Sequence, residues 1–153
     1  MSGTLSPWPL VSRGAQNHPV KTLQYLLCAR GHRVTVDGIF GQRTDAAVRA
    51  FQRERGLTVD GIVGPYTWSG LVIQVQDGSE GDAVRGVQEE FQFRNLSGDP
   101  SKGLQVDGIF GPETDAAVRE FQATIAKDVT EMAVDGIVGP MTWQALVSGM
   151  LSF

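Results

Sequence analysis

The sequence predicts an all-α protein made of two small three-helix bundles in tandem. The first observation is a hexapeptide, Val-Asp-Gly-Ile-(Phe/Val)-Gly, which occurs four times in 153 residues and begins at Val36, Val59, Val106 and Val134. Its fifth residue alternates Phe, Val, Phe, Val, so the chain repeats a unit that itself contains two half-repeats. The second observation is that apolar residues between the copies recur at helical spacing, while no alternating run is long enough to predict a strand.

The repeat divides the chain into two modules, predicted as residues 1–75 and 76–153. A short polar, glycine-rich segment, Gln76 to Gly81, is predicted to be a turn-like linker with little reach. Module two carries two insertions, from Asn95 to Gly103 and between Ala123 and Met132, and both are predicted to be loops. Each module has roughly 65 to 75 residues, close to the lower limit for a stable core, so we expect docking of the modules to help.

The first helix of each module is predicted from a single apolar face. In module one, Pro19 is placed at the first helical position and Gly31 just past the end. The residues predicted to face inward are Val20, Leu23, Leu26 and Leu27 in module one, and Val84, Val87 and Phe91 in module two.

The second helix is predicted to begin after Gly41 and to stop at Gly56, because the residues between them follow an i, i+3, i+4, i+7 pattern. In module two the same pattern follows Pro112. The third helix is short and opens with Pro65 or Pro140. The inward residues of these helices are predicted to be Thr44, Ala47, Val48, Phe51, Trp68, Leu71 and Val72, and their counterparts Thr114, Ala117, Val118, Phe121, Trp143, Leu146 and Val147.

Each hexapeptide is predicted to be a buried turn that leads into a helix. An Asp carboxylate accepts hydrogen bonds from backbone N–H groups one or two residues on, and the following Gly takes a positive φ. The Val before and the Ile after are expected to anchor the turn. The closing Gly lies where free N–H groups meet the positive end of the next helix dipole. Two compatible interpretations remain open: the aspartates cap their own loops, and the turns also rim a shallow groove for a ligand.

With these residues in view, both modules resemble the peptidoglycan-binding domain found beside bacterial and phage cell-wall hydrolases. The pattern has a Gly-x-x-Val-x-x-Leu-Gln start, then Asp-Gly-x-Phe-Gly-x-x-Thr-x-x-Ala-Val-x-x-Phe-Gln, then Val-Asp-Gly-x-x-Gly-Pro-x-Thr-Trp-x-x-Leu, twice over nearly the whole chain. The resemblance implies a three-helix fold and a non-catalytic role in binding wall glycan or stem peptide. Module one departs from the pattern at Asn17-His18-Pro19 and module two at its insertions, which leaves open whether both modules bind.

Candidate ligand contacts come from the turns and from the residues that follow them. Small ligands prefer concave sites with a few polar groups, and sugar rings stack on exposed aromatic side chains. Phe40 and Phe110 fit a half-exposed and a buried position equally well. Tyr66 is predicted to point outward, although Met141 replaces it in module two, and Trp8 is predicted to cover an edge of the core. The candidate peptidoglycan contacts are Asp37, Phe40, Arg43, Asp60, Tyr66, Asp107, Phe110 and Asp135.

We predict no catalytic site, no metal site and no cofactor. His18 and His32 are the only histidines, they form no His-x-x-Glu-His spacing, and both are interpreted as surface residues. Cys28, the only cysteine, is interpreted as a small core residue, and it leaves no partner for an internal disulfide. A glycosidase needs two carboxyl groups across a cleft, but the available glutamates are predicted to lie on solvated helix faces. These are Glu89, Glu90, Glu113 and Glu120.

The net charge of −4 is divided unequally between the modules. Residues 1–75 contain eight basic and four acidic residues, a net charge of +4, whereas residues 76–153 contain five and thirteen, a net charge of −8. An acidic protein without a basic stripe is a poor partner for nucleic acid, and no segment is apolar enough to span a membrane. Either the arginines of helix two attract an anionic wall polymer, or they form a solvated face, or the opposite charges attract the modules to each other. The last alternative predicts that high salt loosens the pair in scattering experiments.

The leading hypothesis is non-catalytic binding of peptidoglycan by two tandem modules, in the cell wall or outside the cell. No signal peptide is recognisable near Met1, so the export route stays open. One alternative is a structural or protein-interaction component, such as a phage or injection-system part, that uses the fold on a protein partner. Another is the targeting part of a wall hydrolase. Co-sedimentation with cell walls separates the first two hypotheses, and a longer reading frame would expose the third.

Overall fold

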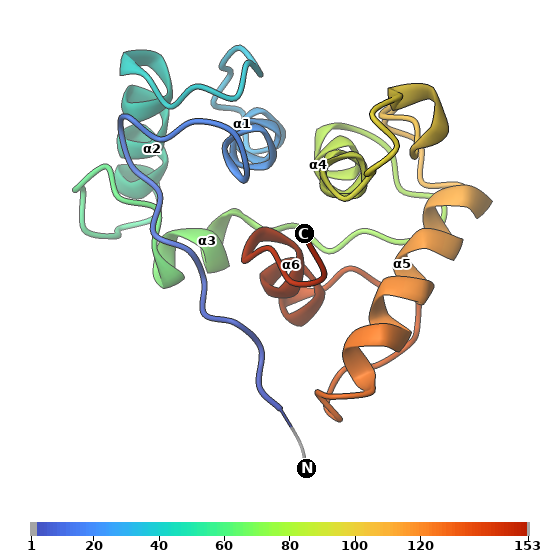
Figure 1. The fold of residues 1–153 in the computed structure, drawn as a ribbon. Coiled ribbons are helices and arrows are strands. Elements are labelled where there is room, and N and C mark those ends of the chain that lie inside the picture. The colour runs from blue at the N-terminus through green and yellow to red at the C-terminus, as the bar shows by residue number, and fades with distance from the viewer. Residues whose placement is uncertain (1–2, 153) are drawn as a thin grey trace.

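The computed structural model describes residues 3–152, and within that range the chain forms helices and isolated β-bridges but no strand (Figure 1). This confirms the predicted all-α class, with three α-helices in each module. Module one contains α1 (Val20–Ala29), α2 (Gln42–Glu54) and α3 (Pro65–Leu71). Module two contains α4 (Asp82–Phe93), the 3-10 helix η1 (Pro100–Lys102), α5 (Pro112–Ala126) and α6 (Pro140–Val147).

Prolines and glycines set the limits of the helices. Pro19 is the N-cap of α1 and not its first helical residue, so the predicted start was wrong by one position. The N–H of Val20 bonds the carbonyl of Asn17, and the helical pattern begins with the Leu23 N–H bonding the Pro19 carbonyl. Gly31 follows the C-cap of α1 with a φ of +88°, in the left-handed region that glycine tolerates. Helices α2, α3, α5 and α6 each begin directly after a glycine whose backbone is extended. These N-cap glycines are Gly41, Gly64, Gly111 and Gly139.

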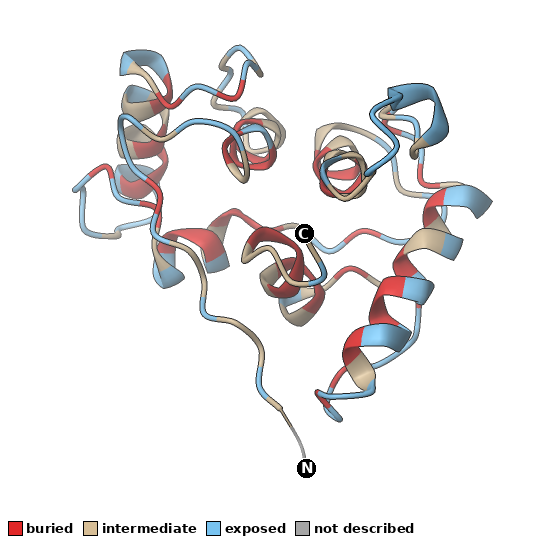
Figure 2. Cartoon of the chain, viewed as in Figure 1, coloured by how far each residue is buried: buried red, intermediate tan, exposed pale blue. Residues whose placement is uncertain are grey.

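The apolar faces predicted from periodicity meet in one continuous core that includes residues of both modules (Figure 2). Trp68 and Trp143 are fully buried, as are the leucines and valines predicted to face inward from α1 and α4. Phe91, Ala47 and Ala117 are only partly buried. Trp8 covers the edge of the core as predicted, since its ring stacks on that of Trp68 with the centroids 6.2 Å apart.

The predicted linker is built into module two. Val75 pairs with Val138, and the indole N–H of Trp143 donates to the carbonyl of Ile73 over 2.8 Å. The N–H of Gly78 also bonds the Phe110 carbonyl. Segment 73–81 therefore lies along the turns of module two as the N-terminal arm lies along those of module one. The corresponding contacts of that arm are the Val11–Val63 bridge and the bond from the Trp68 indole to the Pro9 carbonyl.

The two insertions of module two differ in character. Residues 95–103 form a loop that contains η1, and the Asp99 side chain caps η1 by accepting from the Ser101 N–H. The second insertion was predicted to be a loop, which is wrong for its first part. Helix α5 has 15 residues against 13 in α2, and Ile125, four residues after Phe121, adds a further buried side chain to its apolar face. Val129 and Met132 then return to the core.

The modules pack on each other through α1 and α4, which lie side by side (Figure 1). This is the most extensive contact between any two helices of the described chain. Gly86 of α4 permits the close approach. A Cβ atom at this position would lie 3.4 Å from the Trp143 ring and 3.7 Å from the Thr22 methyl group of α1, which is contact distance with no room for a longer side chain.

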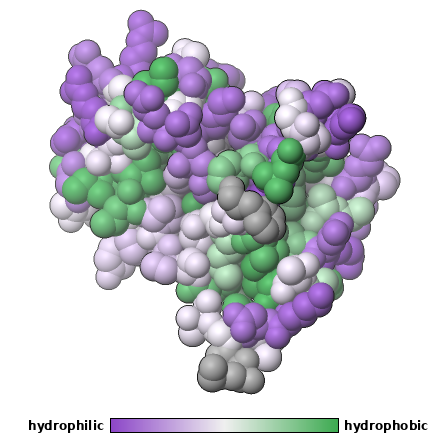
Figure 3. Space-filling view, viewed as in Figure 1, coloured by the Kyte–Doolittle hydropathy of each residue, from purple (hydrophilic) through white to green (hydrophobic). Residues whose placement is uncertain are grey.

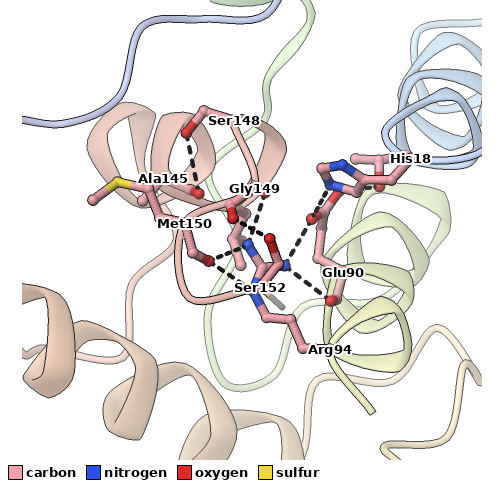
Figure 4. Close-up of polar contacts among 10 residues, drawn as sticks. His18, Glu90, Arg94, Ala145, Ser148, Gly149, Met150 and Ser152 are labelled. Atoms are coloured by element: carbon pink, nitrogen blue, oxygen red, sulfur yellow. Dashed lines mark hydrogen bonds and ion pairs between the residues drawn. The ribbon is translucent and has the colours of Figure 1, made fainter. Parts of the chain in front are cut away.

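Glu90 is completely buried where α1 meets α4 (Figure 4). Its carboxylate accepts hydrogen bonds from Thr22 Oγ1 at 2.6 Å, from His18 Nε2 at 2.8 Å and from Arg94 Nη1 at 2.9 Å. Arg94 in turn donates to the Met150 carbonyl beyond α6. The interpretation of His18 and Glu90 as surface residues was therefore wrong, because docking of the modules covers both side chains.

Candidate functional site

A buried glutamine organises the first Asp-Gly turn. The carboxamide nitrogen of Gln24, on α1, donates to Asp37 Oδ1 at 3.0 Å, to the Ile39 carbonyl at 3.1 Å and to Thr44 Oγ1 at 3.1 Å. Its oxygen accepts from the N–H groups of Asp37 and Gly38 at 3.0 and 2.9 Å. One side chain from α1 thus holds the turn and the first residues of α2 together.

The same arrangement occurs four times. In every copy a buried glutamine donates to the Asp carboxylate, to the Ile carbonyl and to the Thr hydroxyl of the next helix, and accepts from the Gly N–H. The glutamine is hidden because its helix packs under the turn, and its polar atoms are satisfied there as buried groups require. The other three copies join Gln52 to Asp60, Gly61, Ile62 and Thr67; Gln88 to Asp107, Gly108, Ile109 and Thr114; and Gln122 to Asp135, Gly136, Ile137 and Thr142.

Each aspartate also caps its own turn, as predicted. The Oδ1 atom of Asp37 accepts from the Ile39 N–H at 3.0 Å, and the equivalent bond is 2.9 Å long in the other three copies. The backbone N–H of Ile39 holds the pKa of Asp37 below its ordinary value, and Gln24 adds to this effect. The pKa values of Asp60 and Asp107 are lowered by the equivalent isoleucine N–H groups. These carboxylates are therefore charged groups at the surface of the turns.

The isoleucine of the hexapeptide does not anchor the turn, contrary to the prediction. Ile39, Ile62 and Ile109 are 52%, 43% and 55% exposed, whereas the next residue in each copy is buried. Successive side chains of an extended segment point to opposite sides, and the backbone of the isoleucine is already fixed by the Asp and Gln side chains. The anchors are therefore the fifth residues of the hexapeptides: Phe40, Val63, Phe110 and Val138.

A shallow groove lies beside each of the four turns, between the turn and the start of the next helix. The groove volumes are about 400 Å³ and 440 Å³ beside the first and second turns, and about 290 Å³ and 280 Å³ beside the third and fourth. All four include the Asp and the Ile of the hexapeptide. The two larger grooves belong to module one.

Six of the eight predicted contacts line these grooves. Asp37 and Arg43 lie in the first groove, Asp60 and Tyr66 in the second, and Asp107 and Asp135 in the third and fourth. The structure does not place the other two candidates there. Phe40 and Phe110 are only 1% exposed, because their rings fill the core beneath the turn, and they cannot offer a face to a ligand.

The sequence prediction included Tyr66 as an outward-pointing contact but missed the rest of the apolar rim of the grooves, which is formed by Leu10 and the isoleucines. Beside the second turn, Leu10 is 75% exposed and Tyr66 is 83% exposed, with Ile62 between the turn and the helix. On the face drawn in Figure 3, hydrophobic side chains gather at the left edge, where the α2–α3 turn lies. The sequence did contain a signal for the exposed isoleucines. An isoleucine follows Asp-Gly in all four copies, but it belongs to no helical or strand pattern that would place it in the core.

The other titratable side chains considered from the sequence are His32, Cys28, Glu113 and Glu120. His32 was interpreted as a surface residue, but its side chain is 16% exposed and lies 3.3 Å from Glu54. Cys28 is partly buried and its thiol donates to the Val34 carbonyl. Glu113 and Glu120 are exposed, as predicted. Among residues 3–152, no three metal-ligating side chains come close enough together to hold an ion.

The fold and the repeated turns define a class of small helical module, and the sequence matches the family model described as "Putative peptidoglycan binding domain" at residues 16–71 and again at residues 80–146. These two matches cover most of the chain, which therefore belongs to the peptidoglycan-binding domain family.

Relatives of the chain include enzymes that are much longer than the matched region. It is 41% identical over 90 residues to a zinc D-Ala-D-Ala carboxypeptidase of Streptomyces albus G, with 58% of this chain and 30% of the relative covered. It is 30% identical over an alignment of 164 positions to the N-acetylmuramoyl-L-alanine amidase CwlL of Bacillus licheniformis, covering 87% of this chain and 44% of the enzyme. The chain thus spans less than half the length of either enzyme.

A solved structure also resembles the chain. The N-terminal domain of SleB is 40% identical, with 45% of this chain and 94% of that domain covered and a TM-score of 0.41. None of the helices within the described range has the length and apolar character needed to cross a bilayer.

Proposed function

We propose that the chain binds peptidoglycan without catalysing its cleavage, through the grooves beside its Asp-Gly turns. The observation that carries this proposal is the fourfold occurrence of one shallow groove, each with a charged carboxylate and an isoleucine on its rim. The ligand contacts we propose are Asp37, Arg43, Asp60 and Tyr66 in module one, and Asp107 and Asp135 in module two. The place of action is the cell wall, and the binding units are the modules divided near residue 75.

The chemistry of the grooves suits a carbohydrate polymer with peptide branches. Ligand sites combine apolar surface with a few convergent polar groups, and each groove offers both. The groove of the second turn has the strongest apolar rim, because Leu10 and Tyr66 are both exposed there. The corresponding positions of module two hold Gln74 and Met141. We therefore propose that module one contributes more of the binding energy.

Co-sedimentation with purified, polymer-stripped sacculi tests this function. The protein is expected to pellet with the sacculi at low and at high salt, since apolar and hydrogen-bonding contacts resist screening. Absence of pelleting would overturn the proposal and favour a protein partner for the same fold.

Exchange of one residue between the modules provides a matched control. The Tyr66→Met variant is expected to bind about fivefold more weakly, and the reciprocal Met141→Tyr variant more tightly, because an exposed aromatic ring adds contact area at the groove. Equal binding of sacculi by both variants would show that the groove of the second turn contributes no more to binding than the groove of the fourth turn.

A further inference from the structure

The two modules together enclose a hollow that neither module forms alone. Its volume is about 330 Å³, and it lies between the start of α1 and the last turns of α4. His18, Lys21 and Asp37 line it from module one, and Glu89 and Phe93 line it from module two. Asp37 also lines the groove of the first turn, so the hollow and that groove adjoin at its side chain.

One wall of the hollow is aromatic and fixed in place. The ring of His18 stacks on the ring of Phe93, with centroids 3.8 Å apart and an angle of 9° between the planes. The bond from His18 to the buried Glu90 prevents the imidazole from turning. Phe93 nevertheless remains 40% exposed, so the wall offers apolar surface to a ligand.

The Glu89 carboxylate is ion-paired with Lys21 but receives no hydrogen bond from the residues that the structure describes. Its side chain is only 22% exposed. The nearest cation is the ammonium of Lys21, whose Nζ atom lies 3.8 Å away, beyond hydrogen-bond distance. Burial raises the pKa of Glu89, which reflects the cost of keeping a half-buried carboxylate charged here.

The charges around the hollow favour a cationic ligand. Glu89 and Asp37 supply two carboxylates, and Lys21 supplies a single ammonium group. The Lys21 side chain is 50% exposed, so it can turn away from Glu89 into water. An incoming ammonium group would then donate the hydrogen bonds that Glu89 lacks.

We propose that this inter-module hollow binds the side-chain ammonium group of a diamino acid in a wall stem peptide, with Glu89 as its acceptor. The aliphatic stem of that residue packs on the His18–Phe93 wall, since long cationic side chains bury their methylene groups along apolar surface. The rest of the wall polymer continues past Asp37 into the groove of the first turn. This inference rests on the proposed function and assigns the peptide branch to a specific place.

Two peptides that differ in one charge test the inference on the full chain. The probes are the tripeptide L-Ala-γ-D-Glu-L-Lys and the same peptide with an acetylated lysine side chain. In nuclear magnetic resonance titrations the free ammonium peptide is expected to shift the backbone amides of Gly38 and Phe93 and to bind about tenfold more tightly than the acetylated peptide. Equal affinity for the two peptides, or no shift at both amides, would overturn the inference.

Two substitutions are expected to act in opposite directions. Glu89→Gln removes the acceptor charge while keeping the shape, and is expected to weaken binding of the ammonium peptide about tenfold. Lys21→Met removes the internal competitor and is expected to tighten it. A loss of affinity in both variants would contradict the assignment, because general damage to the interface weakens binding in either case.

Sacculus pelleting of the same proteins separates this inference from the proposed function. Pelleting of the wild type without discrimination between the peptides refutes the ammonium site and leaves wall binding intact. Binding of the free peptide without pelleting refutes wall binding and leaves the chemistry of the hollow in place.

Discussion

Glu90 of α4 accepts a hydrogen bond from His18 of the other module over 2.8 Å, and its side chain has no exposure to solvent. Arg94 supplies the compensating positive charge and extends the connection to the end of α6 (Figure 4). Breaking a buried ion pair costs far more than breaking one at the surface, because the remaining charge stays buried without a partner. The two modules are therefore one structural unit, and the network around Glu90 fixes their arrangement.

Removing the Glu90 charge should destabilise the whole chain. We expect Glu90→Gln to lower the free energy of unfolding by about 3 kcal/mol, because Arg94 remains buried and uncompensated. Urea denaturation measures this, with Glu120→Gln on the exposed face of α5 as the matched control. A loss no larger than that of the control would show that the network contributes nothing to stability.

The glutamines under the turns should be equally sensitive to substitution. We expect Gln52→Leu to cost about 2 to 3 kcal/mol, since the N–H groups of Asp60 and Gly61 and the carbonyl of Ile62 lose their partner. The exposed Gln42 of α2, replaced by Leu, is the control. If both variants unfold at the same urea concentration as the wild type, the glutamine does not hold the turn.

Acid should weaken the fold through the turn aspartates. The pKa values of Asp37, Asp60 and Asp107 are lowered in the folded state, chiefly by backbone N–H groups. Their stabilising contribution is therefore complete above the ordinary value of 3.8 and is lost as the pH falls through the lower folded-state values. Urea midpoints measured from neutral pH downward should decline in this acidic window. Replacing all three by Asn, which keeps the acceptor oxygen, should flatten that decline, and an unchanged slope would count against this origin.

We expect high salt to leave the two modules docked. Their opposite net charges, taken alone, would predict that salt loosens the pair. Among the ion pairs between the modules in residues 3–152, the bond from His18 to the fully buried Glu90 is largely shielded from solvent, whereas the long contact between Lys21 and Glu89 is open to screening. We expect the radius of gyration from small-angle scattering to be the same at about 0.05 M and about 1 M salt. Expansion at high salt would mean that long-range attraction, and not the buried network, holds the pair.

The local features of the fold followed from the sequence because they depend on near neighbours. Helical periodicity identified the buried faces of α1 to α6, and the Asp-Gly signal identified four turns with their carboxylate caps. Periodicity does not describe an irregular turn, which is why the prediction wrongly placed Ile39 inward and left the position of Phe40 open. The backbone of Ile39 is fixed by Gln24 from another helix, and that contact decides which side chain points inward.

The module interface could not be predicted from one module at a time. Arg30 and Arg94 are equivalent, since each donates to a carbonyl in the last turn of the third helix of its module, at Leu71 and Leu146. Glu90, four residues before Arg94, therefore occupies the position of the buried Leu26. A charged residue at a core position indicates a buried polar contact. Two of the partners of Glu90, His18 and Thr22, belong to the other module, so they could not be identified from the repeat of module two alone.

The most direct test of the account is the affinity for sacculi of a variant in which the exposed isoleucines Ile39, Ile62 and Ile109 are all replaced by Ser. These side chains line the grooves but are not anchors, so the urea midpoint should stay close to that of the wild type. We expect binding in the co-sedimentation assay to fall at least about tenfold, because three grooves lose their apolar rim. Undiminished binding by a folded triple variant would contradict the claim that the Asp-Gly grooves hold the wall polymer.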